Sequence, residues 1–256
     1  MHGDTSSASM RIFDLHCDTL DRLGLHGSTE YAAFAPQDAG VPHARMSSLA
    51  DNDAHISLDR LDAYAWCQCF AVFVPDTLHG PAAWKFFEHI KAYFDRQMQA
   101  CGKRIVQVSD ARTIESVLGS GKVAALLTIE GGSFLQDSLE HVDDIAKAGV
   151  KMLTLTWNGE NALGSGNDTR HGLTAFGKRV VQALEAHKIV VDVSHLNDAG
   201  FSDVCDIVTR PFAASHSNAR AICGHKRNLT DTQIRAIADS GGIIGLNYCT
   251  EFLSSR

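Results

Sequence analysis

Seven short hydrophobic runs alternate with segments of helical periodicity along most of this sequence. The runs lie at 12–18, 66–74, 123–130, 152–157, 189–195, 212–217 and 241–248. Because they are almost continuously apolar, both faces of the sheet they form should be covered, as in parallel sheets. Alternating strands and helices require right-handed crossovers, and seven strands favour a barrel over an open doubly wound sheet. We therefore predict an α/β fold, a (β/α)8 TIM-type barrel that lacks one strand.

The segments between the runs carry signals for helix ends. Pro81 suits the first turn of a helix, and Ser109 and Thr174 are candidate N-caps. Gly149 and Gly241 follow helical segments, at positions where a left-handed residue commonly ends a helix. These signals predict a helix after most of the strands.

The chain length of 256 residues suits one barrel domain, since such barrels run to about 250 residues. Residues 1–10 are small and polar, and we predict a disordered tail there that does not belong to the fold. Residues 11–256 are predicted to form a single domain. Within it, 19–65 shows little periodicity and is predicted to be a long excursion over the barrel mouth.

Charge and cysteine content narrow the partners and the compartment. A net charge of -7 without a Lys/Arg stripe argues against nucleic-acid binding. The start lacks the features of a secretory signal, and no run of 18 apolar residues is present, so no membrane segment is predicted. Seven cysteines without a C-x₂-C pair fit a reducing compartment, and we expect a cytoplasmic protein.

Side chains suited to metal binding occur at the ends of four hydrophobic runs: His16, Asp18, Glu130, His195 and His216. Barrel active sites form where strands end, and a strand period of two would point both side chains of the H-x-D pair to one face. Any single histidine here is more often a structural hydrogen-bonding group. Burying all five without a metal would be costly, whereas imidazole and carboxylate are ligands of catalytic zinc. Two metal ions sharing one carboxylate could activate water for hydrolysis.

Other polar and sulfur-containing residues have a simpler interpretation. Cys67 and Cys69 lie inside a hydrophobic run and are predicted to pack in the core. Ser194 and Ser215 precede the metal-type histidines, so strand alternation predicts that they point outward against helices. Asn158 is expected to line the pocket, although capping of a loop explains it almost as well.

Longer motifs resemble the renal or membrane dipeptidase family, within the amidohydrolase-type metal-dependent barrels. The resemblance covers nearly the whole chain and rests on DLHCDTL at 14–20, IEGG at 129–132, LTLTWNGEN at 153–161, GLTAFGKRVV at 172–181, VDVSH at 191–195, ASHSNARA at 214–221 and RNLTD at 227–231.

The resemblance implies a role for each motif residue. His16 and Asp18 would hold one zinc ion, His195 and His216 a second, and Glu130 would bridge them as the catalytic carboxylate. Arg227 would bind the substrate's carboxylate, which suits its planar fork of donors. Without the motif, a solvated surface arginine would be the better interpretation. The family resemblance also suggests a homodimer.

Two departures from the family pattern stand out. Trp157 occupies a position where better-known animal members carry a histidine that contacts the reacting carbonyl, and an indole offers one donor but no basic nitrogen. The family also continues into an eighth strand with a G-S-D-F-D-G-like motif, whose aspartate is the proposed general acid/base. The sequence ends at Arg256, before that motif. We therefore expect a chain truncated before the eighth strand.

The leading hypothesis is a binuclear zinc dipeptidase that cleaves the amide bond of short peptides with a free terminal carboxylate. Trp157 and Asn158 are expected beside Arg227 as substrate contacts. One alternative is another metal hydrolase of the same group, acting on a lactone, a cyclic amide or a phosphoester, or deaminating a base. A second alternative is a catalytically impaired barrel that only binds metal.

Overall fold

A computed structural model of the protein describes residues 10–34, 45–136 and 138–254. The strands are β1 (Met10–Asp14), β2 (Tyr64–Phe73), β3 (Ile105–Gln107), β4 (Val123–Glu130), β5 (Val150–Thr154), β6 (Val190–Asp192), β7 (Ala213–Ala214) and β8 (Ile243–Ile244). The helices are α1 (Thr19–Gly24), α2 (Gly80–Ala100), α3 (Ala111–Gly119), α4 (Glu140–Lys147), α5 (Ala175–Ala186), α6 (Asp198–Ile207), α7 (Asp231–Asp239) and α8 (Thr250–Leu253), with a short 3₁₀ helix, η2, at Leu58–Arg60.

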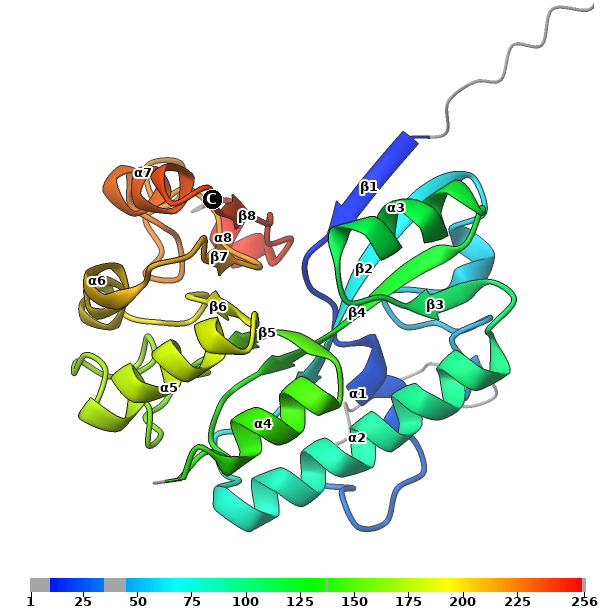
Figure 1. The fold of residues 1–256 in the computed structure, drawn as a ribbon, viewed down its shortest axis with the longest axis horizontal. Coiled ribbons are helices and arrows are strands. Elements are labelled where there is room, and N and C mark those ends of the chain that lie inside the picture. The colour runs from blue at the N-terminus through cyan, green and yellow to red at the C-terminus, as the bar shows by residue number, and fades with distance from the viewer. Residues whose placement is uncertain (1–9, 35–44, 137, 255–256) are drawn as a thin grey trace, which may run out of the picture.

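The strands form one parallel sheet in the order β1-β2-β4-β5-β6-β7-β8. Short β3 pairs only with the first residues of β4. The sheet curls with helices around its outside, and Figure 1 shows an opening between β8 and β1. No pairing joins β8 to β1 within the described part of the chain. The prediction of a TIM-type α/β barrel that lacks a strand is thus confirmed.

Each predicted hydrophobic run overlaps a strand of this curled path, but the strands are often shorter than the runs. The run at 241–248 contributes only Ile243–Ile244, and the run at 212–217 only Ala213–Ala214. The prediction missed β3, because a strand of three residues is too short to show a periodic pattern. The early strands are longer, and all eight residues of β4 are buried.

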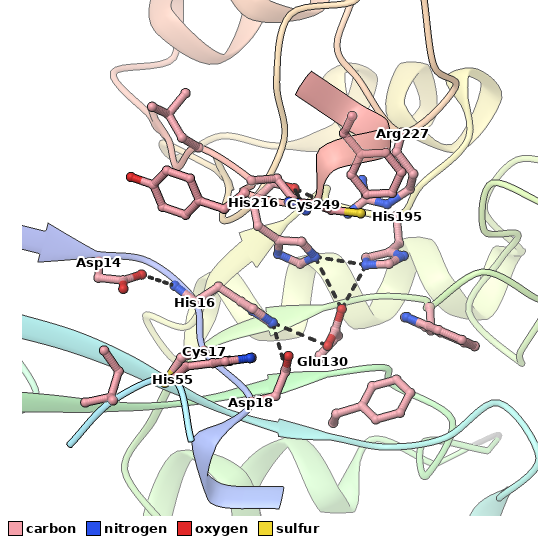
Figure 2. Close-up of a pocket in the computed structure, with 17 residues that line it drawn as sticks. Asp14, His16, Cys17, Asp18, His55, Glu130, His195, His216, Arg227 and Cys249 are labelled. Atoms are coloured by element: carbon pink, nitrogen blue, oxygen red, sulfur yellow. Dashed lines mark hydrogen bonds and ion pairs between the residues drawn. The ribbon is translucent and has the colours of Figure 1, made fainter. Parts of the chain in front are cut away.

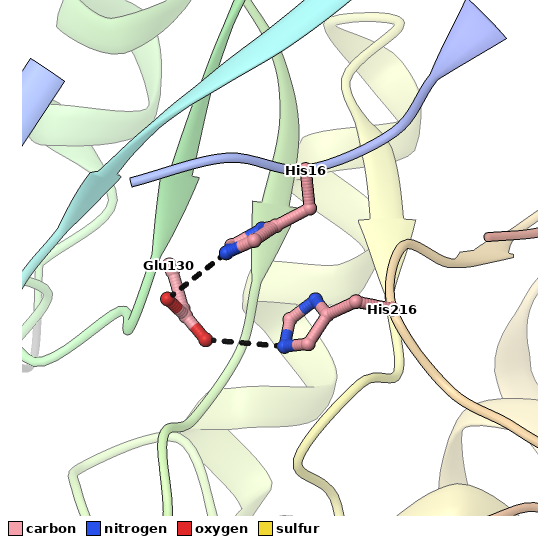
Figure 3. Close-up of side chains that lie close together, drawn as sticks. All are labelled: His16, Glu130 and His216. Carbon is pink, nitrogen blue, oxygen red and sulfur yellow. Dashed lines mark ion pairs between the residues drawn. The ribbon is translucent and has the colours of Figure 1, made fainter. Parts of the chain in front are cut away.

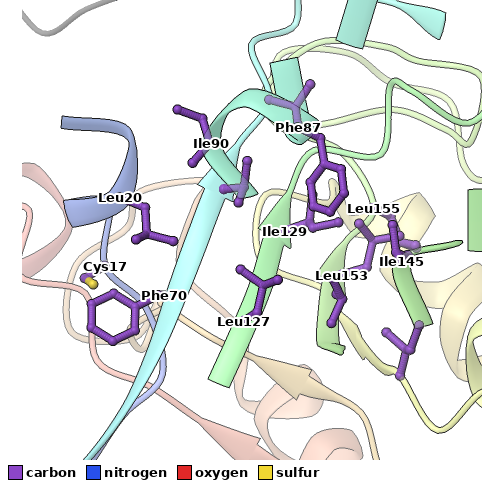
Figure 4. Packing of buried hydrophobic residues seen from close by; sticks show 14 of the residues in the cluster. Cys17, Leu20, Phe70, Phe87, Ile90, Leu127, Ile129, Ile145, Leu153 and Leu155 are labelled. Atoms are coloured by element: carbon purple, nitrogen blue, oxygen red, sulfur yellow. The ribbon is translucent and has the colours of Figure 1, made fainter. Parts of the chain in front are cut away.

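Hydrophobic packing on both faces of the sheet explains the near-continuous runs. On the helical face, Phe70, Leu127 and Leu153 pack in one cluster with Phe87 and Ile90 of α2 (Figure 4). A second cluster includes the buried residues Leu15, Cys67, Cys69, Ala124, Leu126 and Met152. The prediction that Cys67 and Cys69 pack in the core is therefore confirmed.

The helix ends follow most of the sequence signals. The Thr174 side chain accepts a hydrogen bond from the Gly177 amide at 2.9 Å, as predicted. The predicted cap Ser109 is wrong, because Asp110 caps α3 and accepts from the Thr113 amide at 2.9 Å. Gly149 and Gly241 have φ values of 83° and 79°, the left-handed conformation expected after α4 and α7.

The excursion between β1 and β2 is partly helical, since α1 starts at Thr19, which the sequence analysis did not predict. Its later part packs on α2, where the Gln97 side chain accepts a hydrogen bond from the Leu49 amide at 2.9 Å. His55 and Ile56 then reach the cavity described below. The predicted tail at 1–10 lies outside the described residues except for Met10, which begins β1. None of the described helices is long and apolar enough to cross a bilayer.

Candidate metal centre

The five metal-type side chains converge at the C-terminal edge of the sheet (Figure 2). Glu130 is the last residue of β4 and is 4% exposed, so a carboxylate is buried at the centre of the group. His195 and His216 lie in turns shortly after β6 and β7, while His16 and Asp18 follow β1. The parallel strands bring these residues together from positions far apart in the chain.

The two oxygens of Glu130 face different partners. Glu130 Oε2 lies 3.5 Å from His16 Nε2, which is also 3.0 Å from Asp18 Oδ1. Glu130 Oε1 lies 2.8 Å from His195 Nε2 and 3.4 Å from His216 Nε2. Figure 3 shows Glu130 between His16 and His216, a group close enough to hold a metal ion. Glu130 therefore stands between two pairs of potential ligands.

The His16 and Asp18 side chains meet, but the prediction that strand alternation brings them together is wrong. β1 ends at Asp14, and Asp18 has φ −94° and ψ 20° as the residue before α1. A strand period of two therefore does not apply to them. The chain turns into α1 at this point, and this turn brings the carboxylate beside the imidazole.

His195 has an uncommon backbone conformation with φ 69°. A non-glycine residue there carries strain of about 1–3 kcal/mol, which surrounding contacts must offset. The Asn167 side chain donates to the His195 carbonyl oxygen at 2.8 Å and helps to hold the turn. This turn directs the His195 ring toward Glu130.

Both buried histidines have a polar partner behind the ring, at Nδ1. His195 Nδ1 lies 2.8 Å from Asn158 Oδ1, and His216 Nδ1 lies 2.7 Å from Ser215 Oγ. The Ser215 hydroxyl in turn donates to Asp192 Oδ2 at 2.6 Å. Partners of this kind orient metal-binding imidazoles and are important for metal affinity.

The prediction that Ser194 and Ser215 point outward against helices is wrong. Both are buried, and their hydroxyl oxygens lie 3.3 Å apart beside Asp192 and His216. Strand alternation fails because β6 ends at Asp192 and β7 at Ala214. Asp192 was not among the residues predicted for the site, although an aspartate inside the hydrophobic run at 189–195 was an available signal.

The electrostatic environment differs between the histidines. Burial lowers the pKa of His16, but the carboxylates of Glu130 and Asp18 outweigh it and raise the pKa to about 9. Burial and the nearby His16 charge lower the pKa of His216 to about 3. Burial acts to raise the pKa of Glu130, yet the nearby charge of His16 and the hydrogen bond from His195 hold it well below its usual value. Glu130 is thus a buried carboxylate kept ionised by the imidazoles around it.

The metal-type group opens into a cavity of about 800 Å³. Trp157 and Arg227 line this cavity, as do His55 and Phe252. The Trp157 ring packs against Phe73, with ring centres 5.1 Å apart. Asn158 contacts the His195 ring instead of lining this cavity, so its role as a substrate contact stays a prediction.

Arg227 is 5% exposed, which is unusual for a guanidinium. Its contacts are long, at 3.5 Å to Ser217 Oγ and 3.3 Å to the His216 carbonyl oxygen. Burial lowers its pKa to about 10, so it stays charged at neutral pH. Arg227 forms no ion pair with any carboxylate of the residues that the structure describes. A buried cation in this state favours an anionic ligand in the cavity.

A curled parallel sheet with clustered histidines and carboxylates at its C-terminal edge is typical of metal-dependent hydrolases built on barrels. Residues 6–256 match the sequence profile of the membrane dipeptidase family, peptidase family M19. The chain belongs to this family, and it is a metal-dependent peptide hydrolase. A relative from Acinetobacter calcoaceticus, an uncharacterised protein encoded in the PQQ-III 3′ region, is 30% identical over 95% of this chain and 82% of its own length.

Two solved structures have a similar fold. A metallopeptidase from Rhodobacter sphaeroides, bound to a phosphinate mimic of the dipeptide L-Ala-D-Ala, superposes with a TM-score of 0.82 and 26% identity. The alignment covers 96% of this chain and 76% of that protein. The M19 metallopeptidase dipeptidase AC gives the same TM-score of 0.82 with 28% identity, over 96% of this chain and 74% of its own.

Proposed function

We propose that this protein hydrolyses dipeptides with a free terminal carboxylate, using two zinc ions. His16 and Asp18 would hold one ion, His195 and His216 the second, and Glu130 would bridge them. The observation that carries the proposal is that the two oxygens of Glu130 face separate ligand pairs, at 3.5 Å from His16 and 2.8 Å from His195.

The donor set fits zinc, which takes imidazole nitrogen and carboxylate oxygen in catalytic sites. The Nε2 atoms of His195 and His216 lie only 2.9 Å apart, a distance at which two lone pairs repel unless a proton or a cation lies between them. When bound, a zinc pair would supply an acidified water and polarise the scissile carbonyl. The residues of the chain would keep the two ions close and the site partly shielded from solvent.

Arg227 is proposed to bind the terminal carboxylate of the substrate. A charge-assisted, bidentate contact with a carboxylate would satisfy the guanidinium donors of Arg227, which now make only long hydrogen bonds. The Rhodobacter sphaeroides relative holds a mimic of a dipeptide, which supports a substrate of this class. Trp157 would form one wall of the pocket beside the reacting amide, and Asn158 would act nearby.

We propose that residues 11–256 form one domain of a cytoplasmic enzyme, because all seven cysteines are free, as expected in a reducing compartment. A homodimer is proposed from the family resemblance, and nucleic acid is not an expected partner. Sedimentation of the purified protein measures the assembly state.

The test is metal-restorable cleavage. The protein is stripped with a chelator and reconstituted with Zn²⁺, and hydrolysis of a dipeptide panel is followed. The matched control is each dipeptide's C-terminal amide, which lacks the negative charge, and a lactone represents the wider hydrolase group. Cleavage of free dipeptides alone, lost with the chelator and restored by zinc, is expected. Turnover that ignores the carboxylate, or two bound zinc ions without turnover, would contradict the proposal.

A further inference from the structure

We propose that Asp192 and Ser215 form a directional hydrogen-bond relay that fixes the His216 ring with its proton on Nδ1. The relay leaves the Nε2 lone pair of His216 pointing at Glu130. Both residues are positioning residues that act through His216. Their value for metal binding rests on the proposed function, whereas the position of the proton is a property of the chain alone.

Asp192 can only accept hydrogen bonds at this place, and all its contacts are donors. Its side chain is completely buried. Asp192 Oδ1 accepts from the Ser194 and Ser215 amides at 3.0 and 2.9 Å. Asp192 Oδ2 accepts from Thr154 Oγ1 and Ser215 Oγ, both at 2.6 Å. Burial acts to raise the pKa of Asp192, but the hydrogen bonds from these four donors favour the carboxylate form, and the pKa lies below its usual value.

The single proton of the Ser215 hydroxyl decides the direction of the hydrogen bonds in the relay. It is donated to the Asp192 carboxylate, since an ionised carboxylate has no proton to give. Ser215 Oγ can then only accept at its short contact of 2.7 Å with His216 Nδ1. His216 must therefore carry its proton on Nδ1, and its Nε2 is the unprotonated nitrogen that a metal ion requires.

No comparable hydrogen-bond relay fixes which ring nitrogen of His195 carries the proton. Its Nδ1 faces the amide of Asn158 at 2.8 Å, and an amide can present either its oxygen or its NH₂ group after a rotation. The relay behind His216 cannot reverse in this way while Asp192 is ionised. The structure thus gives only one of these two rings a fixed proton.

A purely structural role for Asp192 would be to tie the turn after β6 to the turn after β7. Its Oδ1 does this through the two serine amides. That role depends on Oδ1 and on shape, whereas the relay depends on the acceptor character of Oδ2. An isosteric substitution separates them.

Asp192→Asn is the decisive variant. The amide oxygen would stay opposite the two backbone donors, so the NH₂ group would take the place of Oδ2 and donate to Ser215 Oγ. Ser215 would then donate to His216 Nδ1 and drive the proton of His216 onto Nε2. The relay predicts a reversed tautomer in a folded protein, and a zinc affinity at His216 lower by roughly 10- to 100-fold, the usual effect of losing such a partner.

The first readout is long-range ¹H–¹⁵N NMR of the metal-free protein, with His216 assigned by comparison with His216→Gln. Wild type should show a protonated Nδ1 and an unprotonated Nε2, and Asp192→Asn should show the opposite. Thr154→Val removes the other hydroxyl on Asp192 Oδ2, and Ser194→Ala removes the neighbouring hydroxyl. Both controls should keep the wild-type tautomer.

The second readout is Zn²⁺ affinity, measured by competition with a chromophoric chelator. Ser215→Ala should weaken binding because the ring loses its fixed proton. The double variant Asp192→Asn with Ser215→Ala should bind zinc better than Asp192→Asn alone, because no hydroxyl remains to force the wrong tautomer. A merely structural role predicts additive losses instead.

The outcomes separate the two proposals. The expected tautomers without any zinc binding would support the relay and overturn the metal function. Zinc binding with a protonated Nε2 in the metal-free wild type, or an unchanged tautomer in Asp192→Asn, would overturn the relay and leave the metal function standing. If Asp192→Asn does not fold, an unchanged tautomer in Ser215→Ala overturns the relay equally well.

Discussion

The two sides of Glu130 differ in how firmly the protein prepares them for a cation. On one side, Asp18 is 42% exposed at its side chain and His16 contacts two carboxylates, which raise its pKa to about 9. On the other, His195 and His216 are buried, each with a polar group 2.7–2.8 Å behind the ring. The difference indicates that one side is built in advance, while the other must lose a proton before it can bind metal.

This asymmetry predicts unequal affinities at the two proposed positions. Preoriented imidazoles lose little freedom on binding, so the His195 and His216 side should fill first. The His16 and Asp18 side should exchange its ion more readily, since a proton competes for the same nitrogen.

The largest expected effect comes from removing the group shared by both sides. Glu130→Gln keeps the size of the side chain but removes its charge and one acceptor oxygen, so both ions should be lost or weakly held. The value of kcat/KM should fall by roughly 10³-fold or more, since single electrostatic groups in active sites often contribute about 10²–10³. Metal content and peptide hydrolysis are measured together. Full occupancy of both positions in this variant would refute the bridging role.

Arg227 lines the cavity and contacts the His216 carbonyl oxygen. Its loss should weaken the binding of substrate without changing the binding of metal, which sharpens the comparison. Arg227→Met keeps an apolar stem and removes the charge, so KM for free dipeptides should rise by roughly 100-fold, as expected for charge-assisted hydrogen bonds. Zinc content should stay at the wild-type level. Kinetics with matched dipeptide amides provide the control, since these should be equally poor for both proteins.

Asn158→Ala should act on the buried side alone. The substitution removes the acceptor 2.8 Å from His195 Nδ1, so the ring is no longer oriented. Zinc affinity at the tighter position should fall by roughly 20-fold, within the range known for such partners. A two-step zinc titration reports both positions. An equal weakening of both steps would show that the two sides are not independent.

The smallest expected effect is the change of zinc affinity with pH. His16 in the metal-free chain keeps its proton up to about pH 9, whereas metal binding needs the neutral ring. Affinity at the His16 side should therefore weaken by roughly tenfold for each pH unit below 9. The pKa of His216, about 3, predicts no such dependence on its side at neutral pH. Calorimetry in buffers of different ionisation heat measures the protons released, and release of equal numbers in both steps would argue against the asymmetry.

The fold was largely predictable because continuous hydrophobicity marks strands that are covered on both faces. β4 is the clearest case, with all eight residues buried and its end predicted at Glu130. The later strands were predicted too long, because β7 and β8 keep only two paired residues each and the chain turns early. Hydrophobicity continues past the last hydrogen bond, so it does not define where a strand ends.

The candidate ligands were also predictable, since their side-chain types and positions after strands were visible in the sequence. The polar groups that contact the ligand imidazoles from behind were not predictable in this way. Ser215 was predicted to point outward, yet it lies between Asp192 and His216, because turns after strand ends do not follow the alternation of a strand. Such contacts depend on how two turns from different parts of the chain meet.

The most direct test of a metal pair shared by Glu130 is anomalous X-ray diffraction at the zinc edge from crystals of the zinc-loaded protein. We expect two peaks about 3.5–4 Å apart, one on each side of Glu130, with the higher occupancy beside His195 and His216. A single peak, or peaks that do not share Glu130, would contradict it.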